Sequence, residues 1–557
     1  MDYDDSFLTE QIIAYIGNKR KLLKLIYKAI ETTGIEIKPG IKFLDMFSGS
    51  GVVSRFAKML NFEVFTNDWE TYSKVINSAY LTINKRDISS LFGSEQKFKK
   101  LIEKINNLPE PEEDEQYIAK YYAPKEDDIN KVNYKTERLF YTRKNALTID
   151  KIRNYIEKNY PSSSKSSDIR KIRNLLIAQL VYEAATHTNT SGVFKACHKE
   201  FGGHGKDALT RILTPIALHE PVLIDSDYDC HVYQQDANKL VEELEGIDIA
   251  YLDPPYNQHQ YGSNYHMLNT IAKWDKIPVP LEMNSRGELK EKAGIRHDWV
   301  NTRSSYCYRT EAEIAFKDLI NKLDAHYILI SYSTDGIIPF DTMREICMSK
   351  GKTTIVTNEY TTYRGGKQSN QRKNTNIEFI LCIDTKHKSK DKEVKDIDFI
   401  VAQKKVFLTF KQKFSQKKLK SLNLIKDNKI DFILNGKRIL IDSDNFFTLS
   451  NPKIIDILST DEMLELSKIL DKCACLTKVE EIDELINIAK TNKNDAERFI
   501  KLLPHTLKKL ASKKNKLIFQ AKLKEIKSLK SLFPYEYTKI EEKIKEVENQ
   551  ANIRFST

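Results

Sequence analysis

The stretch that most constrains this chain is Tyr251–Tyr256, with the sequence YLDPPY, where an apolar run ends on a carboxylate, two prolines and a ring. Residues 247–252 are apolar except for Asp248, which predicts a short buried strand. Because proline fixes φ and removes a backbone donor, the strand must stop there with a stiff tip. A carboxylate, free carbonyls and a flat ring suit a planar ligand that carries an amino group. For this tetrapeptide alone, an ordinary strand-terminating turn is the alternative.

Two further strand ends are predicted near the N-terminus. Residues 41–45 read as a strand, followed by a turn with Gly49 and Gly51 and then by a helical pattern. Glycines at such a turn let the backbone approach a ligand closely. The run 62–68 predicts the next strand, and it ends on Asp68, where acidic residues hold ribose hydroxyls in nucleotide-binding sheets. By itself this pattern fits a nucleotide, a flavin or no ligand, and Asp68 could also be a helix N-cap.

Length and charge predict several domains with different roles. A chain of 557 residues is too long for one core. Residues 85–230 are too long for a loop in an α/β sheet and are expected to form an inserted subdomain between residues 1–84 and 231–387. The formal net charge is +11, and the whole excess lies within residues 388–557. This basic part predicts a polyanionic partner, with lysine-rich solubility or codon bias as the alternative.

Other sequence features exclude several classes of protein. No apolar run approaches the length needed to span a bilayer, and the acidic start lacks the positive charges of a secretory signal. The seven cysteines are odd in number and scattered, as expected for reduced thiols in the cytoplasm. The three histidines near Cys197 fit no usual zinc spacing, so no metal site is predicted.

In their order along the chain, these motifs resemble the Dam-like (D12 class) DNA adenine-N6 methyltransferases, which use S-adenosylmethionine. Residues 15–19 (YIGNK) stand where the family has a K-W-A-G-G-K-type motif, with Tyr15 in place of the frequent tryptophan. Residues 47–51 (FSGSG) match F-x-G-x-G, and an acidic strand end, a recognition insert and D-P-P-Y follow in register. The resemblance covers about residues 11–385 and leaves out the basic C-terminal part.

The resemblance implies a fold and a set of site residues. The expected fold class is α/β, a doubly wound Rossmann-like sheet with a mainly helical DNA-recognition insert, beside a basic, mainly helical α+β domain over residues 388–557. The implied catalytic residues are Asp253, Pro254, Pro255 and Tyr256. The implied residues for S-adenosylmethionine are Tyr15, Lys19, Asp45, Phe47, Gly49, Gly51, Asp68, Asp236 and Asp253. The expected DNA contacts are Asn189, Lys195, His198, Lys199, Lys206, Arg364 and Lys367.

The implied reaction is methyl transfer from S-adenosylmethionine to N6 of an adenine flipped out of duplex DNA, protecting host DNA in a restriction–modification system. Asp253 would accept an amino hydrogen while Tyr256 replaces the lost base stacking. Cytosine-N4 methylation, whose motif more often begins with serine, is one alternative, and a noncatalytic nucleic-acid-binding protein with a degenerate methyltransferase fold is another. The expected partners are duplex DNA and a cognate restriction endonuclease, for a cytoplasmic monomer or weak dimer.

Overall fold

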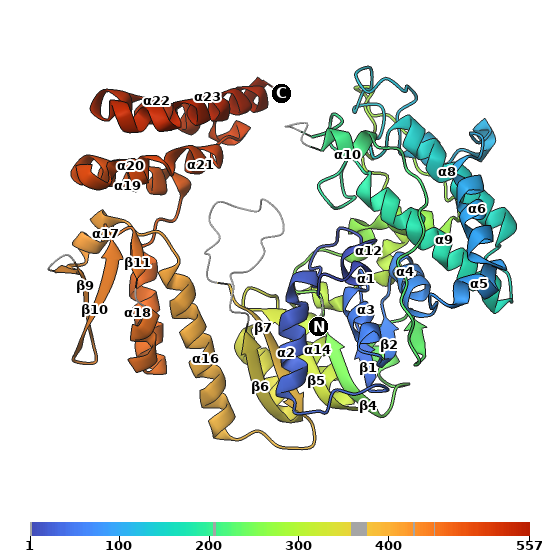
Figure 1. Cartoon of the computed structure of the whole chain (residues 1–557), viewed down its shortest axis with the longest axis horizontal. Helices are drawn as coiled ribbons and strands as arrows, with labels where there is room; N and C mark the ends of the chain where they lie inside the picture. Colours follow the sequence, from blue (N-terminus) through green and yellow to red (C-terminus); the bar gives the residue numbers. More distant parts are fainter. Residues whose placement is uncertain (1–2, 204–207, 358–375, 427–428, 451, 557) are drawn as a thin grey trace. The chain divides into compact units, whose positions relative to one another are not determined.

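The chain divides into two compact units (Figure 1). The computed structural model describes residues 3–203, 208–357, 376–426, 429–450 and 452–556. The first unit contains the described residues of Met1–Asn358 and Glu378–Lys390, and the second consists mainly of Asp391–Thr557. Each unit has its own hydrophobic core.

A seven-stranded sheet is the frame of the first unit, with the strand order β3-β2-β1-β4-β5-β7-β6. The neighbours from β3 to β5 run parallel, and β7 is antiparallel to both β5 and β6. The predicted α/β class with a largely parallel sheet is thus confirmed. The strands are β1 (Lys42–Asp45), β2 (Glu63–Asn67), β3 (Cys230–Tyr233), β4 (Ile247–Leu252), β5 (Ala325–Ser333), β6 (Lys352–Thr357) and β7 (Glu378–Asp384).

Helices flank this sheet and make up the regular structure in the described part of residues 85–229. The sheet-associated helices are α1 (Ser6–Thr9), α2 (Leu23–Thr32), α3 (Val52–Met59), α4 (Thr71–Leu81), α11 (Ala237–Leu240), α12 (Tyr261–Asn264), α13 (His266–Lys273), α14 (Ala312–Lys322) and α15 (Phe340–Lys350). Those in the insert are α5 (Asp87–Phe92), α6 (Glu95–Asn106), α7 (Ile118–Tyr121), α8 (Arg143–Asn159), α9 (Ser167–Thr186) and α10 (Leu209–Leu213). Single 3-10 turns are η1 (Arg20–Leu22), η2 (Glu113–Glu115), η3 (His297–Thr302) and η4 (Ser305–Cys307).

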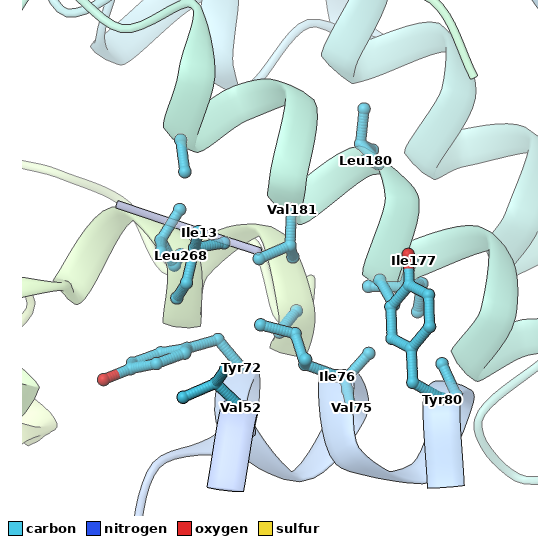
Figure 2. Packing of buried hydrophobic residues seen from close by; sticks show 14 of the residues in the cluster. Ile13, Val52, Tyr72, Val75, Ile76, Tyr80, Ile177, Leu180, Val181 and Leu268 are labelled. Atoms are coloured by element: carbon cyan, nitrogen blue, oxygen red, sulfur yellow. The ribbon is translucent and has the colours of Figure 1, made fainter. Parts of the chain in front are cut away.

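The core of the first unit ties the insert to the sheet. Helix α4 packs against α9 and α13, and its buried face meets theirs in one apolar cluster (Figure 2). The side chains at this contact include Tyr72, Val75, Ile76, Tyr80, Ile177, Leu180, Val181 and Leu268. Because α4 follows β2 directly, this packing fixes α9 and the polar loop after it relative to the strand ends.

The second unit combines a small antiparallel sheet with helices. The sheet has the order β11-β10-β9-β8, and the Asn435–Gly436 turn between β9 and β10 has positive φ at both residues, as a tight β-hairpin turn requires. Its strands are β8 (Ile425–Lys426), β9 (Lys429–Leu434), β10 (Lys437–Asp444) and β11 (Thr448–Ser450). Its helices are α16 (Asp391–Phe410), α17 (Gln416–Ser421), α18 (Thr460–Cys473), α19 (Lys478–Thr491), α20 (Ala496–Ile500), α21 (Leu503–Lys508), α22 (Lys516–Leu532) and α23 (Pro534–Ser556), with turns η5 (Pro452–Ile457), η6 (Lys493–Asp495) and η7 (Lys513–Asn515). Within the described ranges of both units, every helix is too short or too polar to cross a bilayer.

Candidate active site

Strands β1, β2 and β4 end at the same edge of the sheet. Asp45, the last residue of β1, is in register with Thr66 of β2 and with Tyr251 of β4. The residues that follow these strands therefore gather there: Gly49–Gly51, Asp68 and Asp253. The strand order reverses between β1 and β4, which is where open α/β sheets bind their ligands.

The glycine turn is bonded to the end of β2. Asp68 accepts the Gly49 N–H at 2.8 Å through one carboxylate oxygen and the Glu70 N–H at 2.8 Å through the other. Gly49 has a φ of 51°, and a Cβ atom there would lie 2.6 Å from the Tyr15 ring. Glycine is therefore required at this position both by the backbone and by the close approach of Tyr15. Burial raises the pKa of Asp68.

The N-terminal segment docks against the residues that follow Tyr256. The Tyr15 ring stacks on Tyr265 and Tyr261, with ring centroids 4.8 and 5.2 Å away. The Ile16 N–H donates to the Tyr265 hydroxyl at 2.8 Å. The aromatic stacking and this hydrogen bond bring Lys19 to the end of β4, although the two segments are far apart in sequence.

Lys19 connects the carboxylate and the ring at the end of β4. Its ammonium nitrogen lies 3.0 Å from Asp253 Oδ1 and donates to the Tyr256 hydroxyl at 2.7 Å. Burial by itself lowers the pKa of Lys19, but Asp253 and then Tyr256 raise it, so that the pKa is well above its usual value. Burial raises the pKa of Asp253, and Lys19 opposes this rise. Lys19 is therefore a buried, charged group that holds both functional ends of the D-P-P-Y turn.

Two adjoining pockets lie at this edge of the sheet. The strand-edge pocket reaches Asp253, and its lining includes Tyr15, Phe47, Asp68, Trp69, Asp253, Pro255, Gln260, Tyr261, Thr302 and Ser304. The Asp236 pocket is lined by Phe47, Trp69, Asp236, Ala237, Asn238, Ser304, Ser305, Tyr306 and Ala315. The two share Phe47, Trp69, Ala237 and Ser304 as walls. Both pockets therefore combine aromatic side chains with carboxylates.

Asp45 lies beneath these pockets and lines neither of them. Its side chain is 1% exposed and accepts a hydrogen bond from the Ser54 hydroxyl at 2.6 Å. The prediction that Asp45 contacts a cofactor is therefore not supported by the position of its carboxylate. Burial raises the pKa of Asp45 to about 7.

This buried carboxyl predicts a pH-dependent contribution to stability. Since the pKa of Asp45 rises from 3.8 to about 7 on folding, the stability that it contributes is complete at low pH and is lost as the pH rises through about 7. Asp45→Asn removes this titration, so the melting temperature of the variant minus that of the parent should increase from pH 5 to pH 8. The exposed Asp396→Asn is the control, and a difference that stays constant with pH would contradict the assignment.

Comparison with known proteins identifies the family of this chain. The sequence model of the D12 class N6 adenine-specific DNA methyltransferases matches residues 15–346. The chain belongs to this family. Its activity is therefore methylation of adenine N6 in DNA, and the methyltransferase domain includes all three strand ends described above.

Several individual methyltransferases are similar to this one. The type II methyltransferase M.NlaIII of Neisseria lactamica is 31% identical over 366 residues, which cover 66% of this chain and 96% of that protein. The modification methylase LlaI of Lactococcus lactis subsp. lactis is 29% identical and covers 66% of this chain and 54% of its own length. The type II methyltransferase M.FokI of Planomicrobium okeanokoites is 31% identical, with coverages of 60% and 47%.

Asn189 is one of the expected DNA contacts, but its side chain is buried within the protein and bonds to the backbone. Its side chain is fully buried, and its amide donates to the carbonyl oxygens of Leu139 and Glu200 at 3.0 and 3.3 Å. Its Oδ1 atom accepts the Gly202 N–H at 3.3 Å. Asn189 therefore shapes the loop after α9 from within. The sequence pattern predicts DNA contacts from this loop but could not indicate which way this amide points.

The remaining expected contacts stay predictions. Lys195 and Lys199 are exposed on the loop after α9, and His198 is half-buried beside them. Lys199 also lies over the Tyr134 ring, 5.2 Å from its centroid. Lys206, Arg364 and Lys367 lie outside the described residues.

Sequence reasoning missed the strap that lines the methyltransferase pockets, residues 302–306. The Gln260 side chain donates to the Ser304 carbonyl at 3.0 Å and accepts the Ser304 N–H at 2.8 Å. Tyr306 packs edge-on against Phe47 and donates to Asn238 Oδ1 at 2.8 Å. The strap belongs to none of the sequence motifs. Only the tertiary structure brings Gln260 and the strap together.

Proposed function

We propose that the chain transfers the methyl group of S-adenosylmethionine to N6 of an adenine flipped out of duplex DNA, with the donor in the two adjoining pockets and the acceptor at Asp253. The observation that carries this proposal is the meeting of Phe47, Asp68 and Asp253 around one pocket, with the Gly49 N–H bonded to the Asp68 carboxylate. The adenine must leave the duplex because its N6 is otherwise shielded by the base stack.

The chemistry of the pocket lining suits S-adenosylmethionine. Phe47, Trp69 and Tyr306 offer flat faces and edges for an adenine ring at the Asp236 end. Asp68 and Asp253 both line the strand-edge pocket, where carboxylates would attract the hydroxyls and the positive charges of the donor. When bound, S-adenosylmethionine supplies a methyl group that is already activated by its sulfonium.

The chain's own residues then have to orient the acceptor and accommodate its charge. We assign Asp253 to accept a hydrogen of the adenine amino group, which directs the nitrogen lone pair at the methyl group and stabilises the positive charge that develops. Tyr256 offers its ring for stacking on the flipped base. Lys19 is a positioning residue, since its ammonium contacts both Asp253 and the Tyr256 hydroxyl.

The relatives support a role in restriction–modification. Their names describe type II methyltransferases and modification methylases. We propose the same role for this chain, with duplex DNA as the substrate and a cognate endonuclease as the functional counterpart. Asp253 at the first motif position favours adenine as the acceptor.

Transfer of a labelled methyl group to unmethylated DNA, followed by nucleoside analysis, tests the proposed function directly. The label is expected in N6-methyladenine, and sequencing the methylated DNA would define the recognition sequence. Label in N4-methylcytosine would overturn the acceptor assignment. Absence of label in any DNA would overturn the proposal as a whole.

The strap gives a separate test of the donor site. Gln260→Ala removes two hydrogen bonds to Ser304 and should raise KM for S-adenosylmethionine about tenfold, with a smaller loss of kcat at saturating donor. Its neighbour Gln258 is exposed, so Gln258→Ala serves as the matched control. An unchanged KM for the donor in Gln260→Ala would place the donor elsewhere.

A further inference from the structure

The C-terminal unit carries a long stretch of sequence rich in positive charge. Between Glu497 and Glu525 the sequence contains nine lysines and arginines and no aspartate or glutamate. This stretch runs from α20 through α21 into α22, in the red part of the chain in Figure 1. It lies beyond residue 346, where the match to the methyltransferase family ends.

Ion pairs neutralise the two ends of this stretch. Arg498 pairs with Asp444 at 2.7 Å, and Lys501 pairs with Glu497 at 2.6 Å. Toward the other end, Lys522 pairs with Glu525 at 2.7 Å. The uncompensated charge is therefore concentrated in the middle, where α21 turns through η7 into α22.

Six cations surround that turn, and we name them the 508–516 surface: Lys508, Lys509, Lys513, Lys514, Lys516 and Arg554. All five lysines are exposed. In the described part of the chain, Lys508, Lys513, Lys514 and Lys516 have no carboxylate as an ion-pair partner. Arg554, near the end of α23, joins them because its guanidinium donates to the Ala511 carbonyl at 3.2 Å.

The turn that presents these cations is anchored in a hydrophobic core. Leu507, Leu510, Ala511 and Phe519 are buried on the inner side of the turn. The Phe519 ring packs edge-on against Phe555, with ring centroids 5.5 Å apart. This contact holds the end of α23 against the same turn. The lysines therefore project from a packed helical platform, where their mutual repulsion is relieved by a bound polyanion.

We propose that the 508–516 surface binds the phosphate backbone of duplex DNA independently of sequence. The substrate of this family is DNA, and duplex DNA is the polyanion that the enzyme must meet in order to work. Exposed lysine side chains on a turn between helices suit contacts to phosphate rather than readout of base edges. The C-terminal unit thus adds affinity, while the methyltransferase unit supplies the chemistry.

Salt dependence of DNA binding by the full chain is the decisive measurement. Each phosphate that a lysine neutralises contributes about 0.9 to the slope of log affinity against log salt concentration. A variant with Lys508, Lys513, Lys514 and Lys516 all changed to Gln should therefore lower that slope by about 3 to 4. It should also weaken binding to a short fluorescent duplex of arbitrary sequence, most strongly at low salt. Single-turnover methyl transfer with saturating DNA should be unchanged.

A second variant controls for net charge. Lys420, Lys468, Lys472 and Lys490 are exposed in the same unit and, in the described chain, are likewise without carboxylate partners. Changing these four to Gln makes the same charge difference and should lower the slope far less. Equal slopes for the parent and the 508–516 variant, or equal losses in both variants, would overturn the proposal. Because binding is measured without the methyl donor, that result is independent of whether the proposed donor site is correct.

Discussion

Asp253→Asn is expected to reduce methyl transfer to DNA by about a thousandfold or more while leaving the fold intact. The amide has nearly the shape of the carboxylate, but it has no negative charge to stabilise the amino nitrogen as that nitrogen becomes positive. Its NH2 group would also present hydrogens to an amino group that needs an acceptor. The measurement is the single-turnover rate of labelled methyl transfer to unmethylated DNA.

A binding measurement and a control variant distinguish a loss of the chemical step from a loss of donor binding or of structure. The donor is proposed to occupy pockets that extend from Asp253 to Asp236, so most of its contacts remain in the variant and its equilibrium binding should stay within a few-fold of the parent. Asp341→Asn, at an exposed carboxylate on α15, makes the same atomic change away from the strand ends and should retain full activity. Asp253→Asn with activity within tenfold of the parent would remove Asp253 from the catalytic role.

The position of Asp253 beside Asp68 could be predicted from sequence because the geometry of parallel sheets determines it. An apolar run followed by polar residues locates the C-terminal end of a strand, and such ends share one edge. The register of Asp45 with Thr66 and Tyr251 agrees with that expectation, because it brings the ends of β1, β2 and β4 to one edge of the sheet.

The direction in which individual side chains point could not be predicted in the same way. Asp45 follows the same strand pattern as the other motif residues, yet its carboxylate turns inward to Ser54. Asn189 lies in a polar loop typical of DNA contacts, yet its amide bonds to the backbone of that loop. Which oxygen or amide faces a ligand depends on packing between segments, and sequence spacing carries no information on it.

The contact of Lys19 with Asp253 also depends on packing, and it leads to the second large expected effect. Lys19→Met keeps most of the side-chain volume but removes the charge that opposes the rise of the Asp253 pKa on burial. The pKa of Asp253 should then be higher than in the parent, and a smaller fraction of the carboxyl is ionised near neutral pH. We expect methyl transfer at pH 7 to fall by about tenfold or more.

The pH profile distinguishes this electrostatic role from simple loss of structure. Only ionised Asp253 offers a negative charge to stabilise the amino nitrogen as it becomes positive, so activity is lost as the pH falls through its pKa. Lys19→Met should therefore move the acidic limb of kcat/KM to higher pH, and raising the pH should recover part of the lost activity. Lys24→Met, at an exposed lysine on α2, is the control and should leave the limb in place.

Tyr256→Phe separates the two contacts that Lys19 makes. This variant keeps the ring for stacking but removes the hydroxyl that accepts the Lys19 hydrogen bond, while the ion pair with Asp253 remains. Its acidic limb should stay close to that of the parent, with a smaller loss of rate than in Lys19→Met. If Lys19→Met instead lowers activity equally at every pH, Lys19 acts by holding the shape of the turn. The pKa of Asp253 would then depend on burial alone.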